Sequence, residues 1–202
     1  MSIPKSHYFN PKPEVASKPH TVHLRAGALD LELQADRGVF GARRIDLGTL
    51  VLLKEAPPPP ATGDILDLGA GYGPIAIFLA KAAPAARIWA VDVNERALQL
   101  ARANAEAAGL ENVIVAAPDD VPPDVRFAAI YSNPPVRIGK AGLHEILNRW
   151  LDRLEAGGSA YLVVQRNLGS DSLATWLAAS GRSVERLKSK KGYRILRVQG
   201  AQ

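Results

Sequence analysis

The sequence predicts an α/β protein built on a doubly wound parallel sheet and preceded by an N-terminal hairpin and helix. From residue 62 onward, short apolar runs alternate with helical stretches, which is the pattern of a buried parallel sheet with right-handed crossovers. One of these runs leads directly into a glycine-rich loop and then into a helix. Loops of this kind lie beyond the carboxyl ends of the strands, where open α/β sheets bind their ligands.

The first 60 residues are expected to form an extension of the main unit. The first twenty contain four prolines and little apolar periodicity, so we expect them to lie on the surface as an arm. Apolar residues then alternate on either side of a small-residue turn at residues 26–28, which predicts a hairpin. A helix is predicted over residues 45–56 with Asp46 as its cap, and four consecutive prolines end it. These prolines mark a boundary between an extension, residues 1–60, and a main domain, residues 61–202.

The main domain is expected to contain five buried strands joined by helices. The strands cover residues 64–68, 87–92, 112–117, 127–132 and 160–165, the later helices cover residues 95–108, 143–154 and 172–179, and two closing strands cover residues 183–187 and 193–198. Asn94 is a good N-cap for the first of these helices. The second follows an unbroken apolar stripe, which Gly157 and Gly158 are expected to end. The closing strands flank a turn with the sequence KSKKG.

Composition excludes several classes of site and location. The chain has no cysteine, so disulfides, thiolate metal sites and a cysteine nucleophile are excluded. Its four histidines lack the spacing of metal ligands, and we expect no metal. The N-terminus lacks the apolar core of a signal peptide, and no apolar run is long enough to span a membrane, so we expect a cytoplasmic protein without membrane contact. A net charge of +5 favours polyanionic partners such as RNA.

The segment DILDLGAGYGP, residues 64–74, gives the strongest local signal. Its three glycines let the backbone turn sharply and let a ligand approach without meeting a side chain. Pro74 then opens a helix, because proline at the first helical position loses no hydrogen bond. The next strand ends in Asp92, nineteen residues after Gly73, where a carboxylate can accept both hydroxyl protons of a ribose. The pattern predicts a nucleoside-binding site.

The charge of the loop indicates which nucleoside it binds. A dinucleotide fingerprint requires G-x-G-x-x-G, but here the third glycine comes one residue early and Pro74 occupies its place. Asp67 precedes the first glycine by two residues, and a carboxylate there repels a pyrophosphate and attracts an ammonium or sulfonium group. The loop therefore favours a cationic nucleoside over NAD.

This arrangement, D-x-G-x-G-x-G with an acid at the end of the next strand, resembles the class I S-adenosylmethionine-dependent methyltransferases. The resemblance implies that Asp67 lies near the methionine part of the cofactor and that Asp92 holds the ribose. Asp119 matches the position of the acid that contacts the adenine amino group, although it can also be a solvated loop acid. The implied cofactor is S-adenosyl-L-methionine, and the implied cofactor-binding residues are Asp67, Gly69, Ala70, Gly71, Gly73, Asp92, Val93 and Asp119.

The fourth strand is followed by the candidate catalytic residues, Asn133, Pro134 and Pro135. Two consecutive prolines predict a rigid turn whose carbonyls are not drawn into a continuing helix. The Asn133 side chain and the Pro134 carbonyl then offer two fixed acceptors. Acceptors that bind both hydrogens of an amino group direct its lone pair at the methyl carbon and stabilise the positive charge that grows on nitrogen. The motif resembles the (N/D)PP(F/Y/I) signature of methyltransferases that act on exocyclic or amide nitrogen, with Val136 in place of the ring that often stacks on the target base.

The resemblance extends over about residues 7–198 through six segments, HYFNPKP, GVFGARRIDLGTLVLL, ILDLGAGYGPI, VDVNERAL, SNPPVRIGK and KKGYRIL. Together they resemble the small methyltransferase domain family, which is related to the catalytic half of the small-subunit ribosomal RNA guanine-N2 methyltransferase. This resemblance implies a Rossmann-like, doubly wound seven-stranded sheet whose last strand is antiparallel. It also implies that the N-terminal segment packs over the cofactor, where the residues that match the family by position are Phe40, Gly41, Asp46 and Thr49.

Basic side chains are placed where an RNA substrate would need them. The run from Lys188 to Arg197 contains five basic residues and no acid, and further basic residues follow the catalytic turn. Phosphate contacts of this kind give affinity rather than sequence choice. A solvated turn explains the lysine run equally well. The candidate substrate-binding residues are Phe40, Arg137, Lys140, Lys190 and Lys191.

The leading hypothesis is an S-adenosylmethionine-dependent N-methyltransferase that acts on an exocyclic amino group of RNA. Guanine N2 of ribosomal RNA is the favoured target, with ribosomal RNA or a ribosomal subunit as the partner. A protein N-methyltransferase acting on glutamine side chains would use the same two acceptors. An NAD-binding oxidoreductase would have to tolerate Asp67 and Pro74, and an RNA-binding module without catalysis would have no need of the Asn133-Pro-Pro turn.

Overall fold

The computed structural model describes residues 15–27 and 29–200, without the side chain of Arg137. Most of the predicted surface arm, residues 1–14, lies outside the described residues. The elements are β1 (His20–Ala26), β2 (Leu29–Ala35), α1 (Leu47–Glu55), β3 (Thr62–Leu68), α2 (Pro74–Ala82), β4 (Ala85–Val91), α3 (Glu95–Ala107), β5 (Val113–Ala116), η2 (Pro118–Asp120), β6 (Phe127–Ser132), η3 (Val136–Ile138), α4 (Lys140–Leu151), β7 (Leu154–Gln165), η4 (Arg166–Leu168), α5 (Ser170–Ala179), β8 (Ser183–Lys190) and β9 (Tyr193–Gln199). None of the helices in this part of the chain has both the length and the apolar character needed to cross a membrane.

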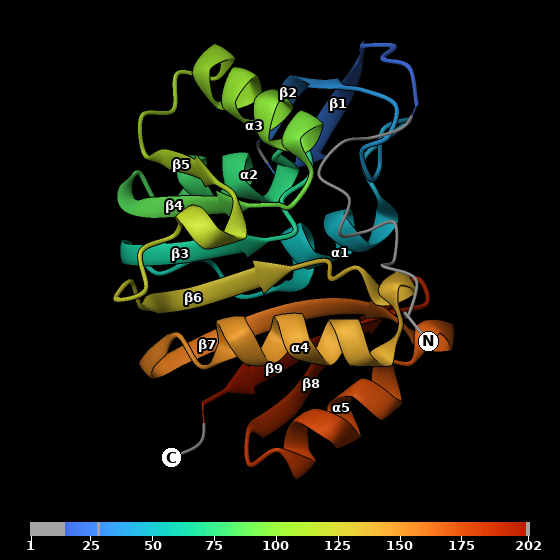
Figure 1. The fold of residues 1–202 in the computed structure, drawn as a ribbon, viewed down its shortest axis with the longest axis vertical. Coiled ribbons are helices and arrows are strands. Elements are labelled where there is room, and N and C mark those ends of the chain that lie inside the picture. Colours follow the sequence, from blue (N-terminus) through green and yellow to red (C-terminus); the bar gives the residue numbers. More distant parts are fainter. Residues whose placement is uncertain (1–14, 28, 201–202) are drawn as a thin grey trace, which may run out of the picture.

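The main sheet has seven strands in the order β5-β4-β3-β6-β7-β9-β8 (Figure 1). Strands β3 to β7 pair in parallel, and β9 is antiparallel to both of its neighbours. The expected doubly wound sheet with an antiparallel last strand is confirmed. The chain enters at β3, moves outward to β5 and then returns to β6 on the other side of β3. This reversal leaves a crevice beyond the carboxyl ends of β3 and β6, which is where doubly wound sheets bind ligands.

The central strands are buried on both faces of the sheet. Along β3, Ile65 joins the apolar core formed with α1, α2 and α3, and Leu66 joins the core formed with α4 and α5. An unbroken apolar run is therefore what this strand requires. Asp67 interrupts the run, and its side chain is nevertheless fully buried. A buried carboxylate is costly unless it is paired or hydrogen-bonded, so Asp67 is a candidate functional residue.

The N-terminal hairpin packs on α3 and shares the core of the main sheet. Asn104, buried on α3, accepts a hydrogen bond from the backbone N–H of Gln34 at 2.7 Å and donates to the Gln34 carbonyl at 2.9 Å. It also donates to the carbonyl of Tyr72 at 2.8 Å. The hairpin is thereby tied to the glycine loop. The predicted domain boundary at residue 60 stays a prediction.

The helix predicted over residues 45–56 is α1, and Asp46 is its N-cap. Asp46 Oδ1 accepts from the backbone N–H groups of Gly48 at 2.8 Å and Thr49 at 3.2 Å, which satisfies donors that have no partner within the helix. The helix ends at Glu55, just before the four prolines. It packs against β7, β9 and α2.

The helix predicted over residues 143–154 begins and ends three residues earlier than expected, and this part of the prediction is wrong. Helix α4 ends at Leu151, and Leu154 begins β7. Gly157 and Gly158 lie inside β7, next to the point where its register with β6 shifts. A Cβ on Gly158 would lie 3.0 Å from the carbonyl oxygen of Phe127, so this irregular pairing requires glycine.

The closing hairpin is tighter than the KSKKG turn predicted. Strand β8 continues to Lys190, and only Lys191 and Gly192 connect it to β9. Their φ angles are 50° and 82°. Positive φ at both central residues is typical of the two-residue turns whose twist matches that of the flanking strands.

Candidate active site

A cavity of about 830 Å³ lies beyond the carboxyl ends of the parallel strands, the edge toward which the arrow of β6 points in Figure 1. Its lining comes from the loop between β2 and α1, from the glycine loop and the end of β4, from the turn after β6 and from the end of β7, with Tyr193 of β9. The predicted site residues that line it are Phe40, Gly69, Asp92, Val93, Asn133, Pro134 and Pro135. Cofactor and catalytic residues predicted from separate motifs therefore share one cavity.

The glycine loop is held by backbone hydrogen bonds to the neighbouring strand. The N–H groups of Gly69 and Ala70 both donate to the carbonyl of Val91, at 2.9 and 3.0 Å. Gly69 has a φ of 77°, and a Cβ there would meet no atom within 4 Å, so the loop presents open space at this point. Gly73 has a φ of 93° and directly precedes α2, which begins at Pro74 as predicted. A loop with this geometry accepts a ligand close to its backbone.

Asp92 braces the glycine loop and faces the cavity. Its Oδ2 accepts from the N–H of Gly71 at 2.8 Å, and its Oδ1 accepts from the N–H of Asn94 at 2.9 Å. Burial raises the pKa of Asp92, and the backbone hydrogen bonds oppose that shift. Each carboxylate oxygen still has a lone pair for a further donor. Both oxygens can therefore accept hydroxyl protons from a ribose.

Asp67 lies behind the loop and does not line the cavity. Its Oδ2 accepts from the N–H of Ala76 at 2.8 Å, and its Oδ1 has no hydrogen-bond partner. The pKa of Asp67 is raised to about 8, chiefly by burial and with a smaller contribution from the negative charge of Asp92. An orphaned, fully buried carboxylate oxygen beside a cavity favours a positive charge nearby.

The side chain of Asn133 is held by the N-terminus of α1. Its Nδ2 donates to Asp46 Oδ1 at 2.7 Å and to Thr49 Oγ1 at 3.2 Å. The carboxylate of Asp46 can only accept, so it fixes which end of the amide is nitrogen. The carbonyl oxygen is thus the atom that Asn133 offers to the cavity, as the proposed chemistry requires.

The diproline turn differs from the expectation in one respect. The carbonyl of Pro134 accepts from the N–H of Val136 at 2.8 Å, and the carbonyl of Pro135 accepts from the N–H of Ile138 at 3.1 Å. The Pro135 carbonyl thereby begins a short helical turn, η3, and the Pro134 carbonyl closes a tighter turn just before it. A carbonyl oxygen has two lone pairs, so Pro134 can still accept one further hydrogen bond.

Several predicted residues lie away from the cavity. Asp119 exposes 91% of its side chain and pairs with Arg149 at 2.8 Å, so its adenine contact stays a prediction. Lys140 and Lys191 are exposed outside the lining. Lys190 pairs with Glu55 at 2.6 Å, which shows that the basic run has acidic partners from distant parts of the chain. The side chain of Arg137 lies outside the described part of the structure.

A sequence model described as the methyltransferase small domain matches residues 30–197. The chain belongs to this family. The predicted resemblance to class I S-adenosylmethionine-dependent methyltransferases and the predicted enzyme class are confirmed. The alternative of an NAD-binding oxidoreductase is wrong, as Pro74 in the place of the third glycine and the acid at position 67 had indicated.

Relatives of this methyltransferase include one of matching length and several longer proteins. It is 36% identical over 196 residues to the uncharacterized protein YbxB of Bacillus subtilis, covering 96% of this chain and 98% of that one. It is 33% identical over 150 residues to ribosomal RNA small subunit methyltransferase C of Shewanella amazonensis, covering 72% of this chain and 43% of the relative. The chain thus spans less than half of that protein's length.

The fold is also shared with a solved methyltransferase. The 16S rRNA N2 G1207 methyltransferase (RsmC) of T. thermophilus, in complex with AdoMet and guanosine, superposes with a TM-score of 0.72 at 24% identity. The match covers 93% of this chain and 52% of that one. This likeness confirms the fold.

The donor set around the glycine loop of this methyltransferase fits a cationic nucleoside. Two carboxylates with raised pKa values, Asp67 and Asp92, lie beside and within the cavity. A positive charge near them would favour their ionised forms. Gly69 leaves space where a side chain would otherwise begin. In the described portion of the chain, no group of three or more histidine, aspartate or glutamate side chains is placed to hold a metal ion.

The methyltransferase cavity contains residues that the sequence analysis did not assign. Gln165, at the carboxyl end of β7, and Tyr193, at the start of β9, both line it, as does Leu168 of η4. A polar residue that ends a predicted buried strand was the available signal for Gln165, and Tyr193 lies within a segment that carried the family resemblance. Nothing in the local sequence around Leu168 indicates its position.

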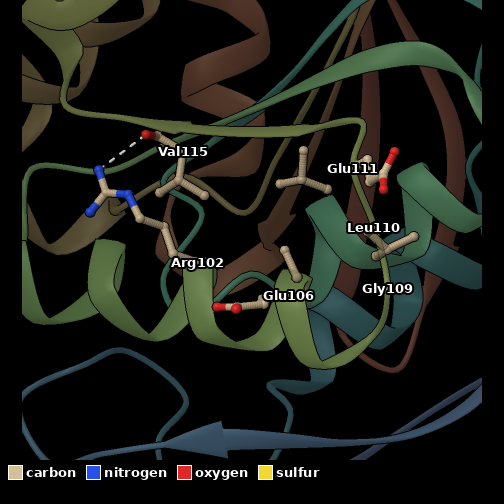
Figure 2. A pocket seen from close by; sticks show the side chains of 8 residues that line it. Arg102, Glu106, Gly109, Leu110, Glu111 and Val115 are labelled. Atoms are coloured by element: carbon tan, nitrogen blue, oxygen red, sulfur yellow. Dashed lines mark hydrogen bonds between the residues drawn. The ribbon is translucent and has the colours of Figure 1, made fainter.

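A second cavity, of about 490 Å³, lies between the end of α3 and the edge strand β5 (Figure 2). It is lined by Arg102, Ala105, Glu106, Gly109, Leu110, Glu111, Val113 and Val115. Arg102 donates to the carbonyl of Val115 at 3.1 Å across it. None of the predicted site residues reaches this surface, so it is separate from the methyltransferase site.

Asp67→Asn is expected to change how the stability of the methyltransferase depends on pH. In the unfolded chain this carboxyl ionises near its usual pKa of 3.8, whereas in the folded protein it stays protonated up to about pH 8. The wild-type protein therefore loses stability relative to the asparagine variant as the pH rises from about 4 to about 8, by about 1.4 kcal/mol per pH unit at most. Denaturant unfolding of both proteins at several pH values measures this gap, and parallel curves would contradict the burial argument.

Proposed function

We propose that this protein transfers a methyl group to an exocyclic amino nitrogen of an RNA base, with guanine N2 of ribosomal RNA as the favoured target. The observation that carries the proposal is the fixed orientation of Asn133, whose amide oxygen is offered to the same cavity that holds Asp92. A cofactor site and an acceptor aimed at a donor nitrogen are the two parts that such a reaction needs.

S-adenosylmethionine is the methyl donor, and when bound it supplies a methyl group made electrophilic by the adjacent positively charged sulfur. The protein contributes binding and orientation on this side of the cavity. Asp92 accepts the ribose hydroxyls, and the loop around Gly69 allows close approach. A positive charge on the donor favours the ionised form of the buried Asp67, so this residue favours a cationic donor over neutral or anionic nucleosides.

The protein orients the substrate on the other side of the cavity. Asn133 Oδ1 and the remaining lone pair of the Pro134 carbonyl each accept one hydrogen of the target amino group. The nitrogen lone pair, otherwise delocalised into the ring, is then directed at the methyl carbon, and the two oxygens stabilise the positive charge that grows on nitrogen. The methylated nitrogen becomes acidic and releases its proton to water, so no general base is required.

Features at the mouth of the cavity favour RNA over a protein substrate. Phe40 lines the cavity and is 64% exposed, so its ring can stack on a base even though position 136 holds valine. Exposed basic residues lie close in sequence to two residues that line the cavity. Arg43 and Arg44 follow Phe40 within four residues, and Arg166 precedes Leu168 by two. An amino group in a helix would have to be extruded to reach Asn133.

The guanine target is supported by relatives rather than by a contact in this chain. The RsmC of T. thermophilus, named for 16S rRNA N2 G1207, was solved with guanosine, and it shares the fold of this protein over about half of its own length. A cytoplasmic location is the expectation that goes with such a substrate. Methylation of a glutamine side chain is the second candidate, because the same two acceptors fit its amide nitrogen.

Transfer of a labelled methyl group tests the proposal directly. The purified protein is incubated with labelled S-adenosylmethionine and either ribosomal RNA, intact small subunits or a protein extract, and the products are digested for mass analysis of nucleosides and amino acids. We expect label in RNA as N2-methylguanosine. Label in protein as methylglutamine would support the second candidate, and label in another RNA nucleoside would overturn the guanine target. Asn133→Ala, discussed below, serves as the control for contaminating activity.

A further inference from the structure

We propose that Asp46 is a positioning residue for catalysis, which selects the reactive orientation of the Asn133 amide from the N-terminus of α1. The proposal rests on the proposed function, in which Asn133 Oδ1 accepts a hydrogen from the target nitrogen. Asp46 and Asn133 are 87 residues apart in the sequence, and their hydrogen bond joins the N-terminal segment to the catalytic turn.

The hydrogen bonds of Asp46 give it two roles at once. Its Oδ1 accepts from the backbone N–H groups of Gly48 and Thr49, which begin α1, and from Asn133 Nδ2 at 2.7 Å. Thr49 is buried, and its Oγ1 accepts a second hydrogen bond from the same Asn133 nitrogen at 3.2 Å. Asp46 itself lines the cavity. The cap of a helix is therefore also the partner of the catalytic side chain.

An asparagine amide has two orientations of nearly equal shape, related by a flip that exchanges oxygen and nitrogen. Only one of them offers an acceptor to the substrate, and the other would set two N–H donors against each other. A threonine hydroxyl can donate or accept, so it does not discriminate between the orientations. A carboxylate can only accept, so Asp46 is the group that excludes the unreactive one.

The charge of Asp46 adds an electrostatic effect to this selection. A hydrogen bond to a charged acceptor polarises the amide of Asn133 and makes its oxygen a stronger acceptor. The negative charge also lies one amide away from the nitrogen that becomes positive during methyl transfer. Both effects favour the transition state over the bound substrate.

The surrounding packing keeps Asp46 in place. Helix α1 packs against β7 and β9. A Cβ on Gly48 would lie 2.7 Å from Tyr193 Cε1, which shows how closely the first turn of α1 approaches β9. A positioning residue must itself be held on a rigid element, and this contact provides that support.

Asp46→Asn tests the role of the charge without removing the helix cap, because asparagine caps helices about as well as aspartate. We expect kcat to fall about 10-fold, with the Kd for S-adenosylmethionine unchanged within about twofold. Leu50→Ala, on the same helix and packed against the apolar core, is the matched control for weakened packing of α1 and should retain its kcat. Equal kcat values for Asp46→Asn and the wild-type protein would overturn the proposal.

A double variant provides a sharper test. In Asn133→Asp two carboxylates face each other, and we expect kcat to fall at least about 10-fold beyond Asp46→Asn. In Asp46→Asn/Asn133→Asp one of the two facing negative charges is removed, while the amide oxygen at 46 can still accept from the N–H groups of Gly48 and Thr49. We expect this pair to recover at least about 10-fold in kcat over Asn133→Asp. A purely structural role for Asp46 predicts no recovery, and its absence would overturn the proposal.

A measurement without substrate separates this proposal from the proposed function. The side-chain amide protons of Asn133, followed by nuclear magnetic resonance, should exchange slowly with water in the wild-type protein and at least about 10-fold faster in Asp46→Ala, because the charged acceptor is gone. Unchanged exchange would overturn the positioning role even if RNA methylation is found. Protected amide protons in a protein that methylates neither RNA nor glutamine would instead count against the proposed function alone.

Discussion

Replacing Asn133 by alanine is expected to lower kcat about 100-fold or more, while the affinity for S-adenosylmethionine stays within about twofold of the wild-type value. The variant loses the side-chain oxygen that Asn133 offers to the target nitrogen. The Pro134 carbonyl, whose position depends on the backbone, remains. The loss should therefore appear in the chemical step, because the acceptors act most strongly when charge develops on nitrogen.

Single-turnover methylation with saturating substrate measures this step, and calorimetry measures the binding of S-adenosylmethionine. Asn148→Ala is a suitable control. Asn148 is an exposed asparagine on α4 that does not line the cavity, and its oxygen accepts from Arg182. Near-normal turnover of Asn133→Ala, with the control equally active, would remove Asn133 from the mechanism. A loss confined to KM would assign it to substrate binding instead.

Asp92→Ala is expected to weaken the binding of S-adenosylmethionine by several-fold to about 100-fold, because a hydrogen bond to a charged group contributes roughly 1.5 to 3 kcal/mol. The substitution removes the acceptors for the ribose and also the brace that holds the N–H of Gly71. Since burial raises the pKa of Asp92, affinity should also decrease as the pH is lowered and the carboxylate is protonated.

Isothermal titration at several pH values checks both parts of this expectation. Asp120→Ala, which removes an exposed acid from η2, controls for the change in net charge. Unchanged affinity in Asp92→Ala would take Asp92 out of the cofactor site. An affinity that does not respond to pH would mean that the neutral carboxyl serves as well as the ionised one.

Elements fixed by nearby residues were predictable from the sequence. The cap at Asp46, the helix start at Pro74 and the cap at Asn94 depend on side chains within one turn of the helix they begin, and all three are present. The glycine loop was predictable for the same reason. The number of strands in the sheet and its antiparallel last strand required the family resemblance, because short apolar runs look alike wherever they pair.

Features that depend on distant parts of the chain were not predictable. The apolar spacing that ends at Leu154 continues the helical pattern of α4, and only pairing with β6 turns that residue and Gly157 into strand. The partner of Lys190 is Glu55, from a helix 135 residues earlier. The hydrogen bond between Asn133 and Asp46 is of the same kind, so the sequence located both residues without revealing that they touch.

The buried amide of Asn104 has a consequence for the design of variants. It bonds at once to the backbone of Gln34 in the hairpin and to the carbonyl of Tyr72, between the second and third glycines of the glycine loop. Removing the hairpin would remove the two hydrogen bonds that join the Asn104 side chain to Gln34. Engineered versions of this enzyme should therefore keep β1 and β2 intact, since a loosened Asn104 would hold the Tyr72 carbonyl of the glycine loop less firmly.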